Sequence, residues 1–166
     1  MYGKQTETAI AAMSRLAEVY EEKTVRLSAT DIADTRGLQR PFVAKILTVL
    51  SQAGLVTGSP GPGGGYALAM PPKDISLYEI YRLFEREDES DDCPFGGGVC
   101  GVGDPCPIHD KLVALRESLD QVLTNTSFEA FRVAYQENGM RPTPKGEKPK
   151  AKRESFRAAK PWRGRR

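Results

Sequence analysis

The sequence predicts a mainly α-helical fold with one small β-hairpin, followed by a long additional helix. Apolar residues recur at helical spacing in the first third of the chain, and the same spacing resumes over residues 109–137. Between these regions, a glycine-rich turn separates two short apolar runs. A chain of 166 residues has room for one small domain and an extended element, and none of its apolar runs is long enough to span a membrane.

Three helices are predicted before the hairpin. Residues 6–20 place their apolar side chains on one face of a helix. The second helix is short, with Ser28 or Thr30 as its cap and Gly37 at its end, where glycine readily takes the left-handed conformation. Pro41 suits the first turn of the third helix. The inward stripe of the third helix consists of Val43, Ile46, Leu47 and Leu50.

The second and third helices have the spacing of a helix-turn-helix. Ala33 is a small residue where the two helices would cross, and Gly37 lies in the turn between them. The apolar pair 55–56 and the run 66–69 then predict two strands joined by the glycine-rich loop. Three helices followed by a hairpin constitute a winged helix, so residues 1–71 are predicted to form a winged helix-turn-helix DNA-binding domain.

The second half of the chain predicts a linking region and a dimerisation helix. Residues 72–107 contain a fourth helix over 76–84 and a loop rich in glycine and cysteine. Residues 108–137 resume helical spacing, and their apolar stripe is long for a single small core. Its members are Leu112, Leu115, Leu119, Val122 and Leu123. We expect this long dimerisation helix to pair with its own copy in a two-fold homodimer, which would match paired DNA half-sites.

Four metal-binding side chains lie within seventeen residues, namely Cys93, Cys100, Cys106 and His109. The odd number of cysteines argues against a disulfide framework, and the N-terminus lacks a secretory signal, so we expect a cytoplasmic protein with reduced thiols. Zinc sites usually gather their ligands in close pairs, whereas these cysteines are widely spaced along a glycine-rich loop. The spacing favours an iron–sulfur cluster over zinc, and a thiol oxidation sensor is a third interpretation.

The fourth ligand of such a cluster has several candidates. His109 is the only histidine in the chain and follows Cys106 by three positions. Glu7, Asp104 and Asp110 are carboxylate alternatives, and a dimer could supply Glu7 from the other subunit. A histidine at the start of a helix can also cap it or face water without binding metal.

Positive charge is distributed unevenly along the sequence. Residues 138–166 contain eleven Lys and Arg against two Glu, a net charge of +9, whereas the preceding residues carry a net charge of −7. We predict that this basic tail is disordered, and that it acts either as a solubilising extension or as a non-specific contact with nucleic acid. Residues 54–70 contain no Lys or Arg. DNA contacts are therefore expected mainly from the region of the third helix, at Arg36, Gln39, Arg40 and Lys45.

The chain resembles the Rrf-type winged-helix regulators, the family that includes IscR and NsrR. The resemblance covers residues 1–137, and its marks are DIADTRGLQRPFVAKILTVLSQAGLV, GPGGGYAL and the three-cysteine loop that ends in CPIH. It implies a homodimeric transcriptional regulator, not an enzyme, that binds double-stranded operator DNA. A 2Fe-2S or 4Fe-4S cluster that senses iron, redox state or nitric oxide would control its affinity.

The resemblance also implies which side chains hold the cluster. Three cysteines would share it with a variable fourth ligand, which is His109 by match to IscR; in NsrR-like members it is a carboxylate near the N-terminus, for which Glu7 is the nearest candidate. The chain departs from the family at Pro60, where many relatives carry a basic residue, and in a first cysteine spacer one residue longer than that of IscR. The alternative functions are a redox or electron-carrier iron–sulfur protein, and a DNA-binding protein with structural zinc and no sensing.

Overall fold

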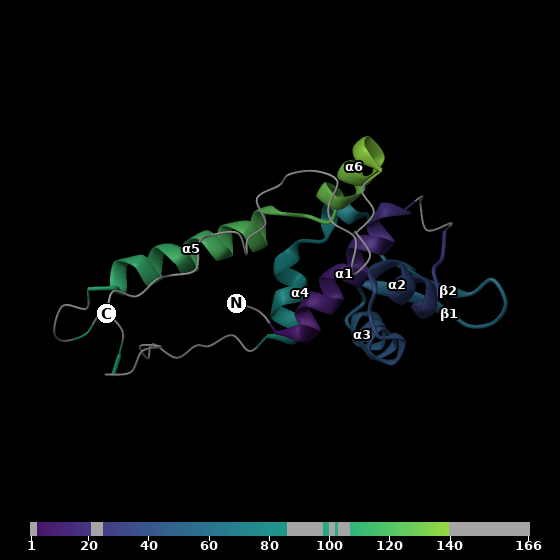
Figure 1. Ribbon diagram of the computed structural model, residues 1–166, viewed down its shortest axis with the longest axis horizontal. Helices are drawn as coiled ribbons and strands as arrows, with labels where there is room; N and C mark the ends of the chain where they lie inside the picture. The colour runs from purple at the N-terminus through teal and green to yellow at the C-terminus, as the bar shows by residue number, and fades with distance from the viewer. Residues whose placement is uncertain (1–2, 21–24, 86–97, 100–101, 103–106, 140–166) are drawn as a thin grey trace, which may run out of the picture.

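The computed structural model describes residues 3–20, 25–85, 98–99, 102 and 107–139. The elements along these residues are α1 (Lys4–Glu18), α2 (Ala29–Arg36), α3 (Arg40–Gln52), β1 (Val56–Ser59), β2 (Gly65–Leu68), the 3-10 turn η1 (Pro72–Asp74), α4 (Leu77–Phe84), α5 (His109–Asn125) and α6 (Glu129–Asn138). The predicted mainly α-helical fold with a hairpin wing is confirmed. The helix-turn-helix and the hairpin lie at one end of the molecule, and α5 extends away from them as an arm (Figure 1).

The limits of the helix-turn-helix follow from local sequence. Ser28 caps α2, because its hydroxyl accepts the backbone N–H of Asp31 at 3.1 Å and its own N–H donates to the Asp31 carboxylate at 3.0 Å. Gly37 ends α2 at a φ of 62°, a conformation that glycine adopts without strain. Pro41 lies in the first turn of α3, as the sequence predicts. The turn and the start of α3 are thereby fixed within a few residues.

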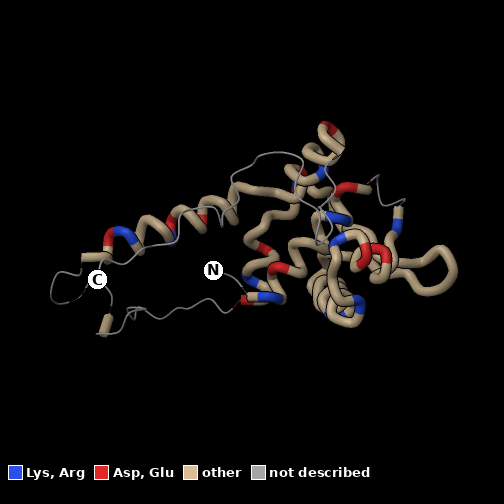
Figure 2. The backbone as a smooth tube through the Cα atoms, in the orientation of Figure 1, with Lys and Arg blue, Asp and Glu red and all other residues tan. Residues whose placement is uncertain are grey.

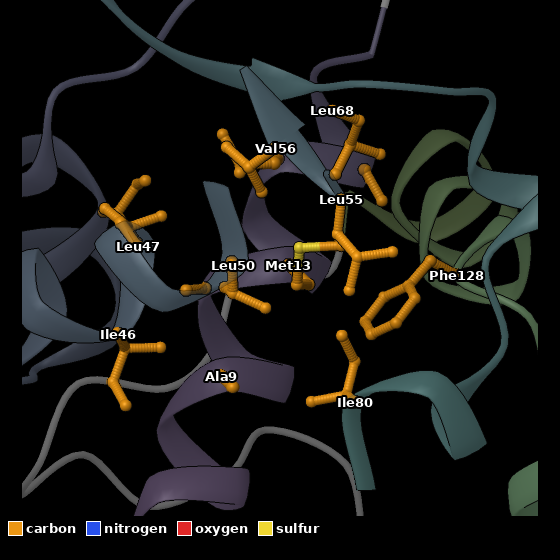
Figure 3. Packing of buried hydrophobic residues seen from close by; sticks show 14 of the residues in the cluster. Ala9, Met13, Ile46, Leu47, Leu50, Leu55, Val56, Leu68, Ile80 and Phe128 are labelled. Carbon is orange, nitrogen blue, oxygen red and sulfur yellow. The ribbon is translucent and has the colours of Figure 1, made fainter. Parts of the chain in front are cut away.

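A single hydrophobic core joins α1, α2, α3, α4 and the hairpin (Figure 3). Met13 of α1 is fully buried near its centre, and Phe128, just before α6, enters the same core. The predicted inward stripe of α3 is buried, with Val43, Ile46, Leu47 and Leu50 each at most 3% exposed. The opposite face of α3 is left free to face solvent, because the apolar face of the helix anchors it to the core.

The wing, defined as the hairpin β1–β2, is held to the rest of the domain by a further backbone segment. Its strands pair antiparallel from Val56 with Leu68 to Ser59 with Gly65. Leu27 forms a bridge with Tyr66, with N···O distances of 3.0 and 2.8 Å. This bridge anchors β2 to the chain just before α2, so the wing and the helix-turn-helix form one unit.

The single helix predicted over 108–137 is wrong, because the structure has two helices there. Thr126 is extended, and its carbonyl accepts the N–H of Leu77 at 2.9 Å. The N–H of Phe128 donates to the carbonyl of Ile75, also at 2.9 Å. This pairing with a distant segment uses backbone groups that a continuous helix would need, and α6 turns back to pack on α1. Only the first part of the predicted dimerisation helix therefore forms the arm.

None of the helices within the described ranges combines the length and the apolar character that crossing a membrane requires. Most of the predicted basic tail, residues 140–166, lies outside the described residues.

Candidate nucleic-acid interface and cluster ligands

The exposed face of α3 carries three of the four side chains predicted to contact DNA. Gln39 is the N-cap of the helix, Arg40 is its first residue and Lys45 lies further along it, and all three residues are exposed. Figure 2 marks the positions of Lys and Arg along the backbone in blue. A helix end with polar and cationic side chains facing solvent is suited to hydrogen bonding with base edges and phosphates in the major groove of DNA.

Arg40 is paired with a carboxylate across the turn. Its Nε and Nη2 donate to the two oxygens of Asp34 at 3.0 and 2.8 Å. This hydrogen-bonded carboxylate raises the pKa of Arg40, so the guanidinium stays charged. Both side chains are more than half exposed, at 62% for Arg40 and 54% for Asp34. An exposed ion pair is weakened by water and salt, so a phosphate can replace Asp34.

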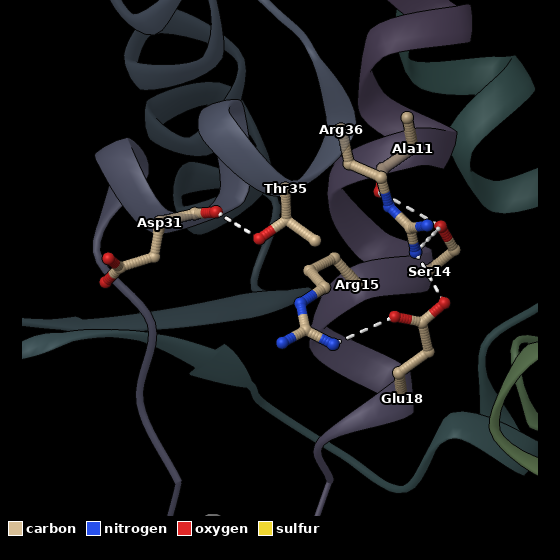
Figure 4. Close-up of polar contacts among 7 residues, drawn as sticks. All are labelled: Ala11, Ser14, Arg15, Glu18, Asp31, Thr35 and Arg36. Atoms are coloured by element: carbon tan, nitrogen blue, oxygen red, sulfur yellow. Dashed lines mark hydrogen bonds and ion pairs between the residues drawn. The ribbon is translucent and has the colours of Figure 1, made fainter. Parts of the chain in front are cut away.

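Arg36 lies away from this exposed face, although the sequence analysis grouped it with the DNA contacts. Its guanidinium points to α1, and its side chain is only 9% exposed. It donates to the carbonyl of Ala11 at 3.1 Å, to the hydroxyl of Ser14 at 2.9 Å and to the carboxylate of Glu18 at 2.7 Å (Figure 4). These partners belong to a helix that precedes Arg36 by about twenty residues, and no local pattern shows that they converge on it.

The wing receives a cation that the sequence analysis missed. Arg26 Nη1 lies 3.5 Å from the carbonyl oxygen of Thr57 and 3.4 Å from that of Gly65, one on each strand of the wing. The residue belongs to the segment before α2, and the bridge between Leu27 and Tyr66 brings it beside the hairpin. Positive charge is therefore present at the wing although residues 54–70 contain none.

The predicted cluster ligands are only partly within the described residues. Cys93, Cys100 and Cys106 lie outside them, as does Asp104, whereas His109 is the first residue of α5 and is half-buried. In the described part of the chain, no three His, Cys, Asp or Glu side chains gather closely enough to hold a metal ion. The donor chemistry itself, three thiols and an imidazole, is that of an iron–sulfur or zinc site.

The two carboxylate candidates within the described residues, Glu7 and Asp110, lie at helix starts. Glu7, in the first turn of α1, forms an exposed ion pair with Lys4 at 2.9 Å, and Asp110 is exposed in the first turn of α5.

The N-terminal end of α1 also holds the start of the cysteine-bearing segment. Glu85, directly before residues 86–97, accepts the backbone N–H of Gly3 at 2.6 Å and the hydroxyl of the buried Thr6. The segment that leads to Cys93 therefore begins beside the first turn of α1, where Glu7 is located.

The family model of Rrf2, described as an iron-dependent transcriptional regulator, matches residues 2–132. The chain belongs to the Rrf2 family. The transcriptional regulator IscR of Klebsiella pneumoniae strain 342 is 31% identical to it over 117 residues, which cover 70% of each chain. The Rrf2 family consists of DNA-binding transcriptional regulators, and the prediction that the chain is not an enzyme is confirmed by this membership.

Solved Rrf2-type structures share the fold. IscR of T. potens matches with a TM-score of 0.64 and 24% identity, covering 86% of this chain and 93% of that one. CymR, the global cysteine regulator of B. subtilis, matches with a TM-score of 0.65 and 23% identity, covering 80% of this chain and 96% of that one. At these identities the likeness extends to the winged-helix architecture alone.

Proposed function

We propose that the chain works as a homodimer that binds an operator in double-stranded DNA, and that an iron–sulfur cluster controls its affinity. The observation that carries the DNA-binding part is the exposed face of α3, which presents Gln39, Arg40 and Lys45 to solvent. In this proposal α3 enters the major groove, and the wing with Arg26 approaches the neighbouring backbone. Arg36 holds the domain together and does not contact DNA.

A binding titration tests the α3 interface. Operator sequences are selected from random double-stranded DNA, and affinity is then measured by fluorescence anisotropy. Arg40→Ala should weaken operator binding by about 1–3 kcal/mol, the usual cost of losing one specific contact. Arg116→Ala, which removes an exposed cation from the arm α5, serves as the control. Unchanged operator affinity in Arg40→Ala would remove Arg40 from the interface.

The homodimer is supported by the apolar face of the arm. Leu115 and Val122 are 67% and 56% exposed, and they lie seven residues apart, about two helical turns, on one side of α5. Large apolar side chains repeated along one face of an exposed helix favour pairing with another helix. Because α5 is the same in every copy of the chain, a two-fold dimer covers both faces at once.

A charged substitution on the arm tests this dimer. Leu115→Glu should give a monomer in size-exclusion chromatography with light scattering, because the dimer would have to bury the new carboxylate. Thr124→Glu adds the same charge nine residues further along, on the opposite side of α5, and should remain a dimer. A Leu115→Glu protein with the mass of a dimer would place the subunit contact elsewhere.

The cluster would be held by Cys93, Cys100 and Cys106, with His109 as the proposed fourth ligand and Glu7 as the alternative. We expect the protein in the cytoplasm, where its thiols stay reduced. When bound, the cluster supplies chemistry that responds to iron supply, oxidation or nitric oxide. The chain itself contributes Glu85, which fixes the start of the cysteine-bearing segment against α1. A change in the cysteine-bearing segment can thus act on α1, the helix on which α2 packs.

Purification without oxygen tests the cofactor. The ultraviolet–visible spectrum should show sulfide-to-iron absorption, and elemental analysis should find iron together with acid-labile sulfide. Comparison of His109→Ala with Glu7→Gln identifies the fourth ligand, because the variant that lacks this ligand should lose or change the iron–sulfur absorption. A colourless protein that contains zinc would replace this proposal with a structural metal site.

A further inference from the structure

A buried carboxylate on α1 has no part in the DNA contacts proposed above. Glu18 is the last residue of α1, and its side chain is only 6% exposed. Its two oxygens accept from two different guanidinium groups, Arg36 Nη2 at 2.7 Å and Arg15 Nη1 at 3.0 Å (Figure 4). A buried carboxylate with two cationic partners forms directional bonds, so it favours one relative placement of the groups that it joins.

The first partner belongs to the helix-turn-helix. Arg36 is the last residue of α2 and lies three positions before Gln39, the N-cap of α3. Its guanidinium makes three bonds to α1, through Ala11, Ser14 and Glu18. These bonds fix the turn of the helix-turn-helix at a set distance from α1, and the direction in which α3 leaves the turn depends on that distance.

The second partner connects the same carboxylate to α6. The guanidinium carbon of Arg15 lies 5.9 Å from the centre of the Tyr135 ring, a cation–π arrangement. Tyr135 belongs to α6, which packs on α1 and follows the arm α5 after a short connection. One line of contacts therefore runs from α6 through Arg15 and Glu18 to Arg36.

We propose that Glu18 and Arg36 are positioning residues for operator recognition. Their ion pair sets the angle of α3 to α1 at the value that sequence-specific contacts require. This inference rests on the proposed DNA-binding function. Hydrogen bonds to base edges depend closely on distance and angle, whereas attraction to phosphates depends mainly on exposed charge. Loss of the pair should therefore reduce the preference for the operator more than the affinity for DNA in general.

The test compares the operator with a scrambled duplex of the same length and composition. Glu18→Gln removes the charge without changing the size of the side chain, and we expect the ratio of the two affinities to fall about tenfold or more. The salt dependence of binding to the scrambled duplex should stay at the wild-type value, because Arg40 and Lys45 remain exposed. An unchanged ratio would overturn the proposal.

A triple variant separates positioning from stability. Glu18→Met with Arg15→Met and Arg36→Met replaces all three charged side chains with apolar ones and leaves no unpaired charge, an exchange that is often neutral or stabilising in other proteins. We expect this variant to unfold at or near the wild-type temperature and still to discriminate poorly. A stable triple variant with wild-type discrimination would show that these charged contacts serve only the fold. A wild-type protein that prefers no operator would overturn both the DNA-binding function and the positioning role, whereas a preference that Glu18→Gln retains would overturn the positioning role alone.

The contact between Arg15 and α6 provides a second test. Tyr135→Ala removes the ring that faces Arg15, and it should lower the affinity ratio in the same direction as Glu18→Gln, though by less. Tyr135→Phe keeps the ring face and should restore most of the ratio. Equal ratios for Tyr135→Ala and the wild-type protein would exclude α6 from the positioning contacts.

Discussion

Asp34 and Arg40 face each other across the turn between α2 and α3, joined by two hydrogen bonds of 3.0 and 2.8 Å. The carboxylate occupies the edge of the guanidinium that would otherwise meet a phosphate or a guanine. In the proposed complex, DNA would have to displace Asp34 before Arg40 could bind it. Asp34 would thus act as an internal competitor of DNA.

Removing this competitor should strengthen DNA binding. Asp34→Asn keeps the size of the side chain but removes its charge, and we expect operator affinity to rise severalfold at low salt and by less at high salt, where the ion pair is screened. Glu137→Gln, which removes an exposed carboxylate from α6, controls for the change in net charge. Fluorescence anisotropy at several salt concentrations gives the operator affinity of each variant. Equal effects of the two substitutions would mean that only net charge matters.

Lys45 should bind a phosphate and so contribute to the salt dependence of binding. Lys45→Ala is expected to weaken binding to all DNA sequences by a similar factor and to reduce the slope of log K against log salt by about 1. Lys111→Ala on the arm α5 is the matched control and should leave the slope unchanged. If Lys45→Ala weakened binding to the operator but not to other DNA sequences, Lys45 would instead be assigned to base recognition.

The wing depends on the absence of a side chain at Gly65. A Cβ atom there would lie 2.7 Å from the carbonyl oxygen of Leu27, and the residue has a φ of 137°. Gly65→Ala should therefore lower the free energy of unfolding by at least about 1–3 kcal/mol, measured by urea denaturation. At Gly63, with a φ of 75°, an added Cβ meets no atom within 4 Å, so Gly63→Ala should cost less. An equal loss of unfolding free energy in Gly65→Ala and Gly63→Ala would show that Leu27 can move away from the added methyl group.

The N-terminal cap of α2 should make part of the stability depend on pH. Hydrogen bonds from the hydroxyl and backbone N–H of Ser28 hold the pKa of Asp31 below its ordinary value of 3.8. A lowered carboxylate pKa contributes stability above the ordinary value, and that contribution is lost as the pH falls through the lowered one. The difference in unfolding free energy between the wild-type protein and Asp31→Asn should therefore be present at pH 7 and shrink in acid. A difference that does not vary with pH would contradict this role of the cap.

Local signals in the sequence predict the helix-turn-helix well. Ser28, Gly37 and Pro41 each act on the backbone within a few residues of their own position, and the structure uses all three as expected. The buried stripe of α3 is equally predictable, because a helix with one apolar face has one way to pack on a core.

The features that the sequence did not predict arise from contacts between distant segments. The break between α5 and α6 is caused by backbone pairing of Thr126 and Phe128 with residues some fifty positions earlier. Glu18 turns Arg36 toward α1 and away from the residues proposed to contact DNA, and Arg26 reaches the wing through a bridge that no local pattern indicates. The ligand roles of Cys93, Cys100, Cys106 and His109 stay predictions.

Operator affinity of the same protein with and without its cluster tests the account most directly. Protein purified without oxygen is divided, and one half is stripped of iron by a chelator. The two halves should differ in operator affinity by about 5-fold to 150-fold, the usual range for coupling between two sites. A variant with Cys93, Cys100 and Cys106 replaced by serine should match the stripped half. Equal affinity in all three preparations would contradict control of DNA binding by a cluster.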